Sequence, residues 1–504
     1  MKWVKRGFAV LVVVLALFIG TVAVRTVTSR PKAGATAPVD LAPAPEIDEQ
    51  SAAARLGEAI RFETISRTAE VVENPESFLA FHAFLETAYP RVHAALRREV
   101  VADFSLLYSL PGSDPSLPPI LLLAHQDVVP VEAGTEKDWE VPPFSGEIRD
   151  GYVYGRGADD DKGSLIAIME AMETLLERGF KPRRAVMLAF GHDEEVLGGG
   201  AKAIVRLLQE RNVRAWFVID EGMGVLLDSP LTGKPAALIG IAEKGYMTVR
   251  VTAGAEGGHS AMPPRETAAE RLSRAILAIR ANPFPGDLNE GPIAEFLDAF
   301  APHLGFGMRA MIVNRWAFGP LLRSKMGATP PGNALLRTTI APTELRGGTK
   351  ENVLPQEVQA LINLRLHPRD SVEGALEHLR RSVSGIERIK MEVQGTPTEP
   401  SPVASTASDS YALLAAAARA HAPDGAPVVP MLVLGGTDSR YFAPVAENIY
   451  RYAPAWGSQS EYKRVHGTGE RLSVENLGRM ARFYAQLMAT GAETGARSQQ
   501  STNR

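Results

Sequence analysis

Histidine and carboxylate residues gather in four short motifs along this chain, and the first three follow strand-like apolar runs. In chain order the motifs are His125-Gln126-Asp127, Asp159-Asp160-Asp161-Lys162, Asp193-Glu194-Glu195 and His466. Open α/β sheets hold their chemistry at the carboxyl ends of the strands, so we expect the motifs to meet at one sheet edge. Two histidines and several carboxylates from distant segments favour a two-metal hydrolytic centre.

The order of residues inside each motif indicates how the side chains divide their roles. His125 and Asp127 alternate at a strand end, so both can face the same side. Glu194 and Glu195 are adjacent and diverge, so one can bind metal while the other faces the substrate as a general base. The acidic run 159–161 would repel itself without cations, although a surface acidic turn is an alternative interpretation.

Composition narrows the class of protein. At 504 residues the chain is long enough for two or three domains with a large core. The net charge of −4 gives no reason to expect a nucleic-acid partner. Because the sequence has no cysteine, any metal must be held by histidine and carboxylate, and disulfide and thiolate chemistry are excluded.

The N-terminal segment is typical of a membrane anchor or a secretion signal. Lys2, Lys5 and Arg6 precede an apolar run at residues 7–24, which is near the lower length limit for a membrane span. The run is longer than a usual signal-peptide core and ends in a poor cleavage site, so an uncleaved signal anchor is favoured over a removed signal peptide. We expect the body outside the cytoplasm, periplasmic or extracellular, and secreted if the segment is cleaved.

Alternating strand and helix patterns predict a largely parallel α/β sheet, interrupted after Lys244 by a smaller α+β domain. Strands are predicted at 119–124, 152–157, 184–190, 216–219, 246–252, 333–340, 358–366 and 431–434. Helices are predicted at 51–62, 77–89, 164–178, 267–280, 372–383 and 410–420. The predicted segments are a signal segment at 1–27, a Pro/Ala-rich linker at 28–47, a catalytic domain at 48–242 and 397–490, a lid or dimerisation domain at 243–396, and a disordered tail at 491–504.

The motifs together resemble those of the dizinc aminoacylase, carboxypeptidase S and carnosinase family of metallopeptidases (clan MH). The resemblance covers roughly residues 47–487 and is closest to the carboxypeptidase S and N-fatty-acyl-amino-acid synthase/hydrolase branch. It is carried by LLLAHQDVVP, YGRGADDDKGS, GHDEEVLGG, VIDEG, GGHSAMPP, NALLRTT, INLRLHP, GGTDSRYF and HGTGERL. It implies a mostly parallel-sheet dizinc hydrolase domain with an inserted α+β lid that often forms a homodimer.

The resemblance also implies which residues bind metal. Two Zn²⁺ per subunit are expected, although Co²⁺ or Mn²⁺ could substitute. The implied ligands are His125, the bridging Asp160, Glu195, Asp220 and His466. Glu221 is the alternative to Asp220, because both acids stand at the end of the fourth strand. Three consecutive acids also leave Asp159 or Asp161 as alternatives for the bridging position.

Two further roles follow from the same resemblance. Asp127 is expected to orient His125 and raise its basicity, and Glu194 is expected to be the general base. The family often has a cis peptide after the bridging acid, which here falls between Asp160 and Asp161.

Substrate contacts are expected from the inserted domain and a glycine loop. His259 resembles a lid histidine that stabilises the tetrahedral oxyanion and, in dimeric relatives, comes from the partner subunit. Asn333 and Gly436 resemble substrate-binding positions, and Arg365 suits a bidentate grip on a free α-carboxylate. Apolar residues between 282 and 331 could line an acyl pocket, although lid core is the commoner role for such residues.

These features lead to a metal-dependent amidohydrolase. The expected substrates are N-acyl amino acids or peptides cleaved at the C-terminal residue, with Glu194 taking a proton from a metal-activated water. A dipeptidase of the same family is the first alternative. The second is a catalytically dead, membrane-tethered binding protein.

Overall fold

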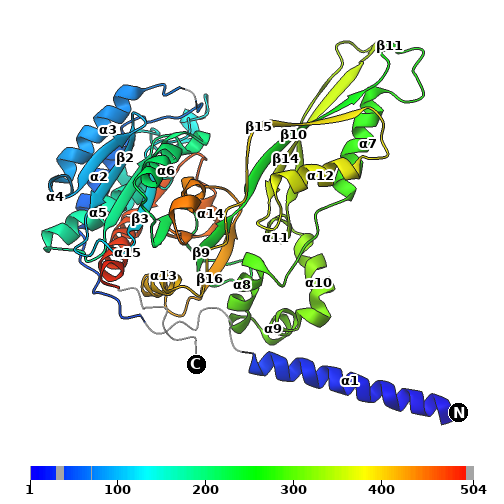
Figure 1. Cartoon of the computed structure of the whole chain (residues 1–504), viewed down its shortest axis with the longest axis horizontal. Helices are drawn as coiled ribbons and strands as arrows, with labels where there is room; N and C mark the ends of the chain where they lie inside the picture. Colours follow the sequence, from blue (N-terminus) through cyan, green and yellow to red (C-terminus); the bar gives the residue numbers. More distant parts are fainter. Residues whose placement is uncertain (1, 30–38, 70, 495–504) are drawn as a thin grey trace. The chain divides into compact units, whose positions relative to one another are not determined.

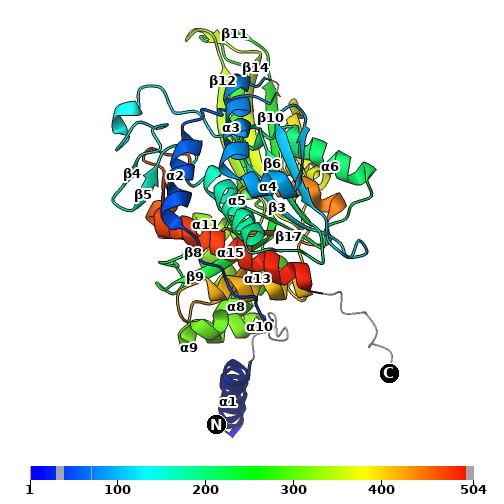
Figure 2. The same cartoon turned by 90° about the vertical axis from the view of Figure 1, so that its left-hand side faces the viewer.

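The computed structural model describes residues 2–29, 39–69 and 71–494, and it divides into two compact units. Unit 1 comprises Met1–Pro31, Ala242–Val403 and Leu432–Gly436, and unit 2 comprises Lys32–Ile241, Ala404–Met431 and Thr437–Arg504. Residues 30–38 of the linker predicted at 28–47, and the last ten residues of the predicted tail, lie outside the described residues. Figures 1 and 2 give two views of the chain.

A ten-stranded mixed sheet organises unit 2 among the described residues. Its strands, in spatial order, are β1 (Arg97–Val101), β2 (Ser105–Leu110), β6 (Val186–Gly191), β3 (Ile120–His125), β7 (Phe217–Asp220), β17 (Ile449–Arg451), β9 (Ala236–Glu243), β8 (Val225–Leu226) and β18 (Trp456–Gly457), with β16 (Val428–Val433) also paired to β9. The four central strands β6, β3, β7 and β17 run parallel. The predicted α/β class with mostly parallel central strands is confirmed.

Helices cover both faces of this sheet, which explains why its central strands are apolar throughout. Every residue of β3 and of β6 is buried. Along β3 the side chains alternate between two cores, with Leu122 in one and Leu123 in the other. The helices of the first core are α2 (Glu49–Ile60), α3 (Pro75–Ala88), α4 (Pro90–Ala95), α5 (Lys162–Glu177), α13 (Asp409–Ala420) and α15 (Val474–Glu493). Those of the second are α6 (Gly200–Glu210) and the 3₁₀ segment η4 (Asp438–Val445).

The end of α15 differs from the predicted disordered tail. The helix continues to Glu493 and packs along α5, as Figure 2 shows. Arg184 anchors this end, because its guanidinium donates to the carbonyls of Gly491 and Thr494. Because the buried Arg184 needs these carbonyl partners, the helix remains ordered beyond residue 491, where a disordered tail was predicted.

A small three-stranded sheet in unit 2 joins two distant loops. It contains β4 (Ile148–Arg149), β5 (Tyr152–Tyr154) and β19 (Arg471–Ser473), with β5 in the middle. Strand β5 leads into the acidic run, and β19 follows the loop that carries His466 and the short helix α14 (Gln459–Tyr462). Antiparallel pairing of β5 with β19 therefore holds these two loops together.

Unit 1 is built on a four-stranded antiparallel sheet. The strand order is β12 (Thr339–Gly347), β14 (Glu357–Leu366), β10 (Gly245–Gly254) and β15 (Ile389–Thr398). One face packs on α7 (Ala268–Ala281) and α12 (Val372–Ser382), so buried and partly exposed residues alternate along β14. A short ladder pairs β11 (Gly258–His259) with β13 (Val353–Leu354).

The strand predicted at 333–340 was wrong in its first half. Residues Pro330–Leu336 form helix α11, and β12 begins only at Thr339. Thr329 caps the helix by accepting the N–H of Gly332, and Pro330 occupies the first turn, where proline is tolerated. This capping signal outweighs the apolar pattern of the following residues.

Four further helices belong to unit 1. Helix α1 (Lys2–Thr28) is long and apolar enough to cross a membrane, and its apolar window is not buried in the protein. The other three form an insert between α7 and α11, namely α8 (Gly291–Phe300), α9 (Phe306–Val313) and α10 (Arg315–Gly327) (Figure 1). Phe296 and Phe300 are buried and pack edge to face, so they form core of this insert.

Candidate metal centre

Strand order brings two of the motifs, together with Asp220, to one edge of the ten-stranded sheet in unit 2, whereas the acidic run follows β5 of the small sheet. Strand β3 lies between β6 and β7, and all three run parallel. His125 ends β3, Glu194 and Glu195 follow β6, and Asp220 ends β7. Because neighbouring parallel strands end on the same side, their last side chains lie close together.

The Asp160 carboxylate lies between the two histidines. Its Oδ1 is 3.0 Å from His125 Nε2, and its Oδ2 is 3.0 Å from His466 Nε2. Glu195 Oε2 also approaches His466, at 3.1 Å from its Nε2. One carboxylate with an oxygen directed at each histidine is the arrangement that a bridging ligand requires.

The acid that faces His125 from the end of β7 is Glu221, which differs from the prediction of Asp220. Glu221 Oε1 lies 3.6 Å from His125 Nε2. The Asp220 carboxylate instead accepts the backbone N–H groups of Glu221 and Ser439, each at 2.9 Å. Both of its oxygens are therefore engaged by main-chain donors, and Glu221 takes the position next to His125.

Two groups of potential ligand atoms occur among the described residues. His125, Glu194 and Glu221 form one, and His125, Asp160 and Glu195 form the other, each with its donor atoms within 4.8 Å of one another. All are nitrogen or carboxylate oxygen donors, which suit Zn²⁺ and related divalent ions. Glu195 Oε1 is buried without a hydrogen-bond partner, which leaves it available to a cation.

Asp127 organises the backbone of the site. Its carboxylate accepts the N–H groups of Glu194 and Glu195, each at 3.1 Å. Its main-chain carbonyl lies 2.9 Å from His125 Nδ1, while its carboxylate is 3.4 Å from the same nitrogen. Asp127 thereby links the histidine to the Glu194-Glu195 turn.

Burial and mutual repulsion raise the pKa of several carboxyl groups in the site, so binding of a cation there is favoured. Burial, together with neighbouring acids, raises the pKa of Glu194 well above its usual range and that of Glu221 to about 8. Hydrogen bonds to Asp160 and Glu195 raise the pKa of His466 to about 10. Burial opposes the charge on His125, but bonds to Asp127, Asp160 and Glu221 raise its pKa overall. Divalent cations would replace these shared protons.

Glu470 and Arg156 support the acidic run, and neither role was predicted from the sequence. The buried Glu470 Oε1 accepts the N–H groups of Gly157, Asp159 and Asp160 at 3.0 to 3.1 Å. Its Oε2 accepts from the buried Arg156 guanidinium at 2.5 Å. Glu470 stands in the HGTGERL motif, so the motif was recognised but this role was not. The peptide between Asp160 and Asp161 is cis, as expected.

Asp438 is a second buried acid that was not predicted. Its Oδ2 has no hydrogen-bond partner, and burial with the charges of Asp220 and Asp127 raises its pKa well above the usual range. A Cβ at Gly191 would collide with Asp438 Oδ2. Glycine at the end of β6 therefore makes room for this carboxyl.

The four residues predicted to contact substrate belong to unit 1. His259 is exposed on β11, with Nδ1 accepting the N–H of Ala261. Asn333 lies in α11, and Arg365 lies in β14 with its guanidinium 5.0 Å from the Tyr246 ring centre. Gly436 precedes η4.

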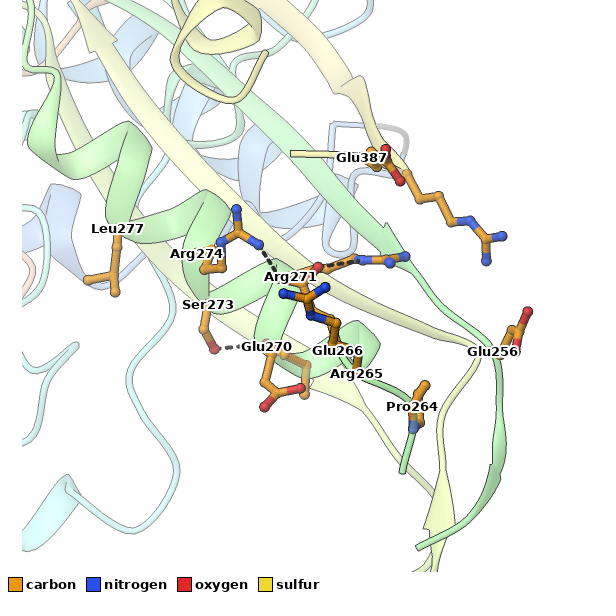
Figure 3. A pocket seen from close by; sticks show the side chains of 12 residues that line it. Glu256, Pro264, Arg265, Glu266, Glu270, Arg271, Ser273, Arg274, Leu277 and Glu387 are labelled. Atoms are coloured by element: carbon orange, nitrogen blue, oxygen red, sulfur yellow. Dashed lines mark hydrogen bonds and ion pairs between the residues drawn. The ribbon is translucent and has the colours of Figure 1, made fainter. Parts of the chain in front are cut away.

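Unit 1 also has a cavity of about 1010 Å³ beside α7, shown in Figure 3. Its lining mixes acidic and basic side chains and contains no histidine. Glu266 lies between Arg271 and Arg274 and forms ion pairs with both. The lining of this cavity therefore does not fit a metal centre. Both groups of potential metal ligands found among the described residues lie in unit 2.

Comparison with known proteins agrees with the site. Residues 121–490 match the model of peptidase family M20/M25/M40. A probable carboxypeptidase S-like protein of Dictyostelium discoideum is 37% identical over 482 residues, 94% of this chain and 91% of that protein. The N-fatty-acyl-amino acid synthase/hydrolase PM20D1 of Xenopus tropicalis is 38% identical over 436 residues, 85% of this chain and 84% of that protein.

The solved structures support the same fold. An M20 family metallo-carboxypeptidase from Sulfolobus solfataricus superposes with a TM-score of 0.62 at 17% identity, covering 87% of this chain and 99% of that one. Sequence and fold therefore agree with the site in unit 2. The chain belongs to peptidase family M20/M25/M40 and is a metal-dependent hydrolase of amide bonds.

Proposed function

We propose that this enzyme hydrolyses the amide bond of N-acyl amino acids, or of peptides at the C-terminal residue, at a centre that holds two Zn²⁺. His125 and Glu221 would hold one ion, His466 and Glu195 the other, and Asp160 would bridge them. The observation that carries the proposal is the Asp160 carboxylate, with one oxygen 3.0 Å from each histidine. When bound, the zinc pair would polarise the scissile carbonyl and activate water.

Glu194 is the proposed general base. It is adjacent to Glu195, and its carboxylate lies in the group formed with His125 and Glu221. Its N–H is held by Asp127, so the side chain extends from a fixed turn. Burial raises its pKa, which suits a group that takes a proton from water and returns it to the leaving nitrogen.

The substrate class rests on the relatives and on side chains of unit 1. The names of the similar proteins mention carboxypeptidase S and N-fatty-acyl-amino acids, and both substrate types release an amino acid with a free carboxylate. Arg365 is proposed to bind that carboxylate and His259 to stabilise the oxyanion, with Asn333 and Gly436 as further contacts. We also propose that unit 1 forms the homodimer contact.

Helix α1 is proposed to be an uncleaved anchor that keeps the body outside the cytoplasm. Its length and apolar composition support this role, as does its exposure along the apolar window. Lys2, Lys5 and Arg6 precede the apolar run and Arg25, Arg30 and Lys32 follow it, so the proposed orientation does not rest on the distribution of basic residues.

The test compares the metal-loaded full chain with Glu194→Gln on two substrate sets. One set contains N-long-acyl amino acids, and the other contains N-blocked dipeptides, each with a matching C-terminal amide. We expect Glu194→Gln to keep its metal and to lose about 10²–10⁴-fold in kcat. Glu177→Gln, an exposed position on α5, is the control. Equal activity of Glu194→Gln and wild type would reject the base, and equal cleavage of acids and amides would reject carboxylate recognition.

A further inference from the structure

Helix α1 contacts the helical insert of unit 1 from Phe18 to its C-terminal end. Residues 3–20 are exposed, whereas Thr26 is 1% exposed. Asn314, buried between α9 and α10, donates to Thr26 Oγ1 at 3.1 Å, and Arg309 donates to the Ser29 carbonyl at 3.2 Å. The apolar part of α1 is therefore exposed, while its C-terminal end is held by the insert. This arrangement is expected of a membrane-spanning helix that joins the rest of the protein at the membrane surface.

Aromatic contacts define how far along α1 the insert reaches. The Phe18 ring lies 5.7 Å from Trp316 and 6.3 Å from Phe318. At about 1.5 Å per residue, Phe18 lies about 9 Å before the end of the apolar run at Val24. Trp316 is therefore level with the last part of the span, the depth at which tryptophan is enriched in membrane proteins.

The insert exposes large apolar side chains next to this helix end. On α9, Phe306 is 62% and Met308 is 41% exposed, and on α10, Trp316 is 58% and Leu321 is 48% exposed. Single exposed apolar residues are common on soluble proteins, but four on two consecutive short helices form a group. Their exposure leaves a surface that water solvates poorly.

The same two helices are basic. Residues 306–327 include Arg309, Arg315, Arg323 and Lys325 and contain no aspartate or glutamate, and of these cations Arg315 is paired with Asp298 of α8. Basic side chains among exposed aromatic and aliphatic ones are typical of elements that lie in a bilayer interface. Each cation near an anionic bilayer surface adds to the attraction.

We propose that α9 and α10 form a second membrane contact, an interfacial surface that enters the headgroup region of the bilayer spanned by α1 and favours anionic phospholipids. The proposal rests on the proposed anchor, because α1 sets the level of the bilayer. Asn314 and its bond to Thr26 would hold the surface at that level. Unit 1 would then be fixed to the membrane at two places instead of swinging on one helix.

Absence of native cysteine allows each position to be tested with one label in the full chain. Met308→Cys and Leu321→Cys would carry an environment-sensitive fluorophore, with the protein reconstituted into vesicles of phosphatidylcholine and phosphatidylglycerol. Lipids with nitroxide at the headgroup or along the acyl chain would quench the label according to depth. Val13→Cys, in the middle of α1, reports on the anchor, and Leu277→Cys, 69% exposed on α7, is the matched control of unit 1.

We expect headgroup nitroxides to quench the labels at 308 and 321 at least about twofold more than the label at 277. Replacing Arg323 and Lys325 with Gln should reduce that quenching in anionic vesicles and leave it unchanged in neutral ones. Labels at 308 and 321 that behave like the one at 277, while the label at 13 is quenched, would overturn the interfacial surface and leave the anchor intact. Loss of quenching at 13 as well would overturn the anchor.

Other occupants of this surface would give a different pattern. If a second copy of the chain covered α9 and α10, the labels would be shielded from both soluble iodide and lipid nitroxides, and shielding would increase with protein density in the vesicles. That result would overturn the lipid contact. Intact mass of the purified chain verifies that α1 is present in every variant.

Discussion

Asp160 and His466 come from distant parts of the sequence, yet Asp160 Oδ2 lies 3.0 Å from His466 Nε2. The pairing of β5 with β19 produces this proximity, because the first strand precedes the acidic run and the second follows the histidine loop. His466 adopts a left-handed backbone conformation, with φ of 60°. The proposed bridging acid and its second histidine thus depend on one short sheet.

Replacing Asp160 with Asn should remove the proposed bridge without changing side-chain volume. We expect the stoichiometry to fall from two metals to one or none and kcat to fall by more than about 100-fold, because both ions lose a shared anionic ligand. Metal analysis after dialysis, with kcat measured in parallel, checks this. Asp159→Asn is the neighbouring control, and a stronger effect there than at Asp160 would show that the register is shifted.

Asp220 and Glu221 should differ sharply in their effects. Glu221→Gln should weaken metal binding by about 10-fold or more, since this carboxylate faces His125. Asp220→Asn should chiefly lower the free energy of unfolding, by about 1–3 kcal/mol, because its oxygens accept two backbone N–H groups. Chelator competition and denaturant unfolding separate the two effects. A larger loss of metal affinity in Asp220→Asn would restore Asp220 as the ligand.

Arg156→Met should destabilise the enzyme even though Arg156 contacts no proposed ligand side chain. The substitution leaves the buried Glu470 carboxylate without its cation, a loss of about 3–5 kcal/mol for a buried pair. Arg67→Met, which breaks an ion pair with Glu73 on the surface, should cost less than about 1 kcal/mol. Chemical unfolding of the full chain gives both values, and similar losses would contradict a special role for the Arg156–Glu470 pair.

The metal-free protein should lose stability as pH rises, and its metal affinity should increase. The pKa of His466 is raised from 6.5 to about 10, so its stabilising contribution is complete below pH 6.5 and is lost as pH approaches 10. The pKa of Glu221 is raised from 4.5 to about 8 in the folded chain. A rise in pH from 4.5 to 8 therefore also destabilises the folded state, because Glu221 ionises less readily there than in the unfolded chain. Cations compete with these protons and bind more tightly at higher pH.

Thermal unfolding with and without metal at pH 6 to 9 tests this linkage. The apo melting temperature should fall over that range, and the gap between holo and apo should widen. A constant gap would mean that metal binding displaces no protons from the site. His466→Gln removes one titrating group and should flatten the dependence of the gap on pH.

Much of the site could be predicted from local sequence. Apolar runs that end in His125 or in Asp193-Glu194-Glu195 predict buried strands with chemistry at their ends, and the structure contains β3 and β6 there. Strand alternation also predicted that His125 and Asp127 can face the same side, and the two residues are in contact. These features depend on backbone periodicity and on short spacings between residues, both of which can be read from a local stretch of sequence.

Other features depended on packing between distant segments. Asp220 and Glu221 have the same acidic chemistry, and the fold distinguishes them because the N–H groups of Glu221 and Ser439 engage the Asp220 carboxylate. Glu470 acts on the acidic run through a turn more than three hundred positions away in the chain. A single sequence without its fold does not indicate which donors surround a carboxylate.

The sequence by itself determined the class of site, because histidine and carboxylate motifs at strand ends, without cysteine, allow few chemistries besides divalent metal hydrolysis. It also determined the apolar N-terminal helix through composition alone. Tertiary structure decided which acid faces His125, what supports Asp160, and that the end of α1 packs on the insert through Thr26 and Asn314. Those outcomes depend on side-chain direction and long-range hydrogen bonds, which arise only when distant segments pack together.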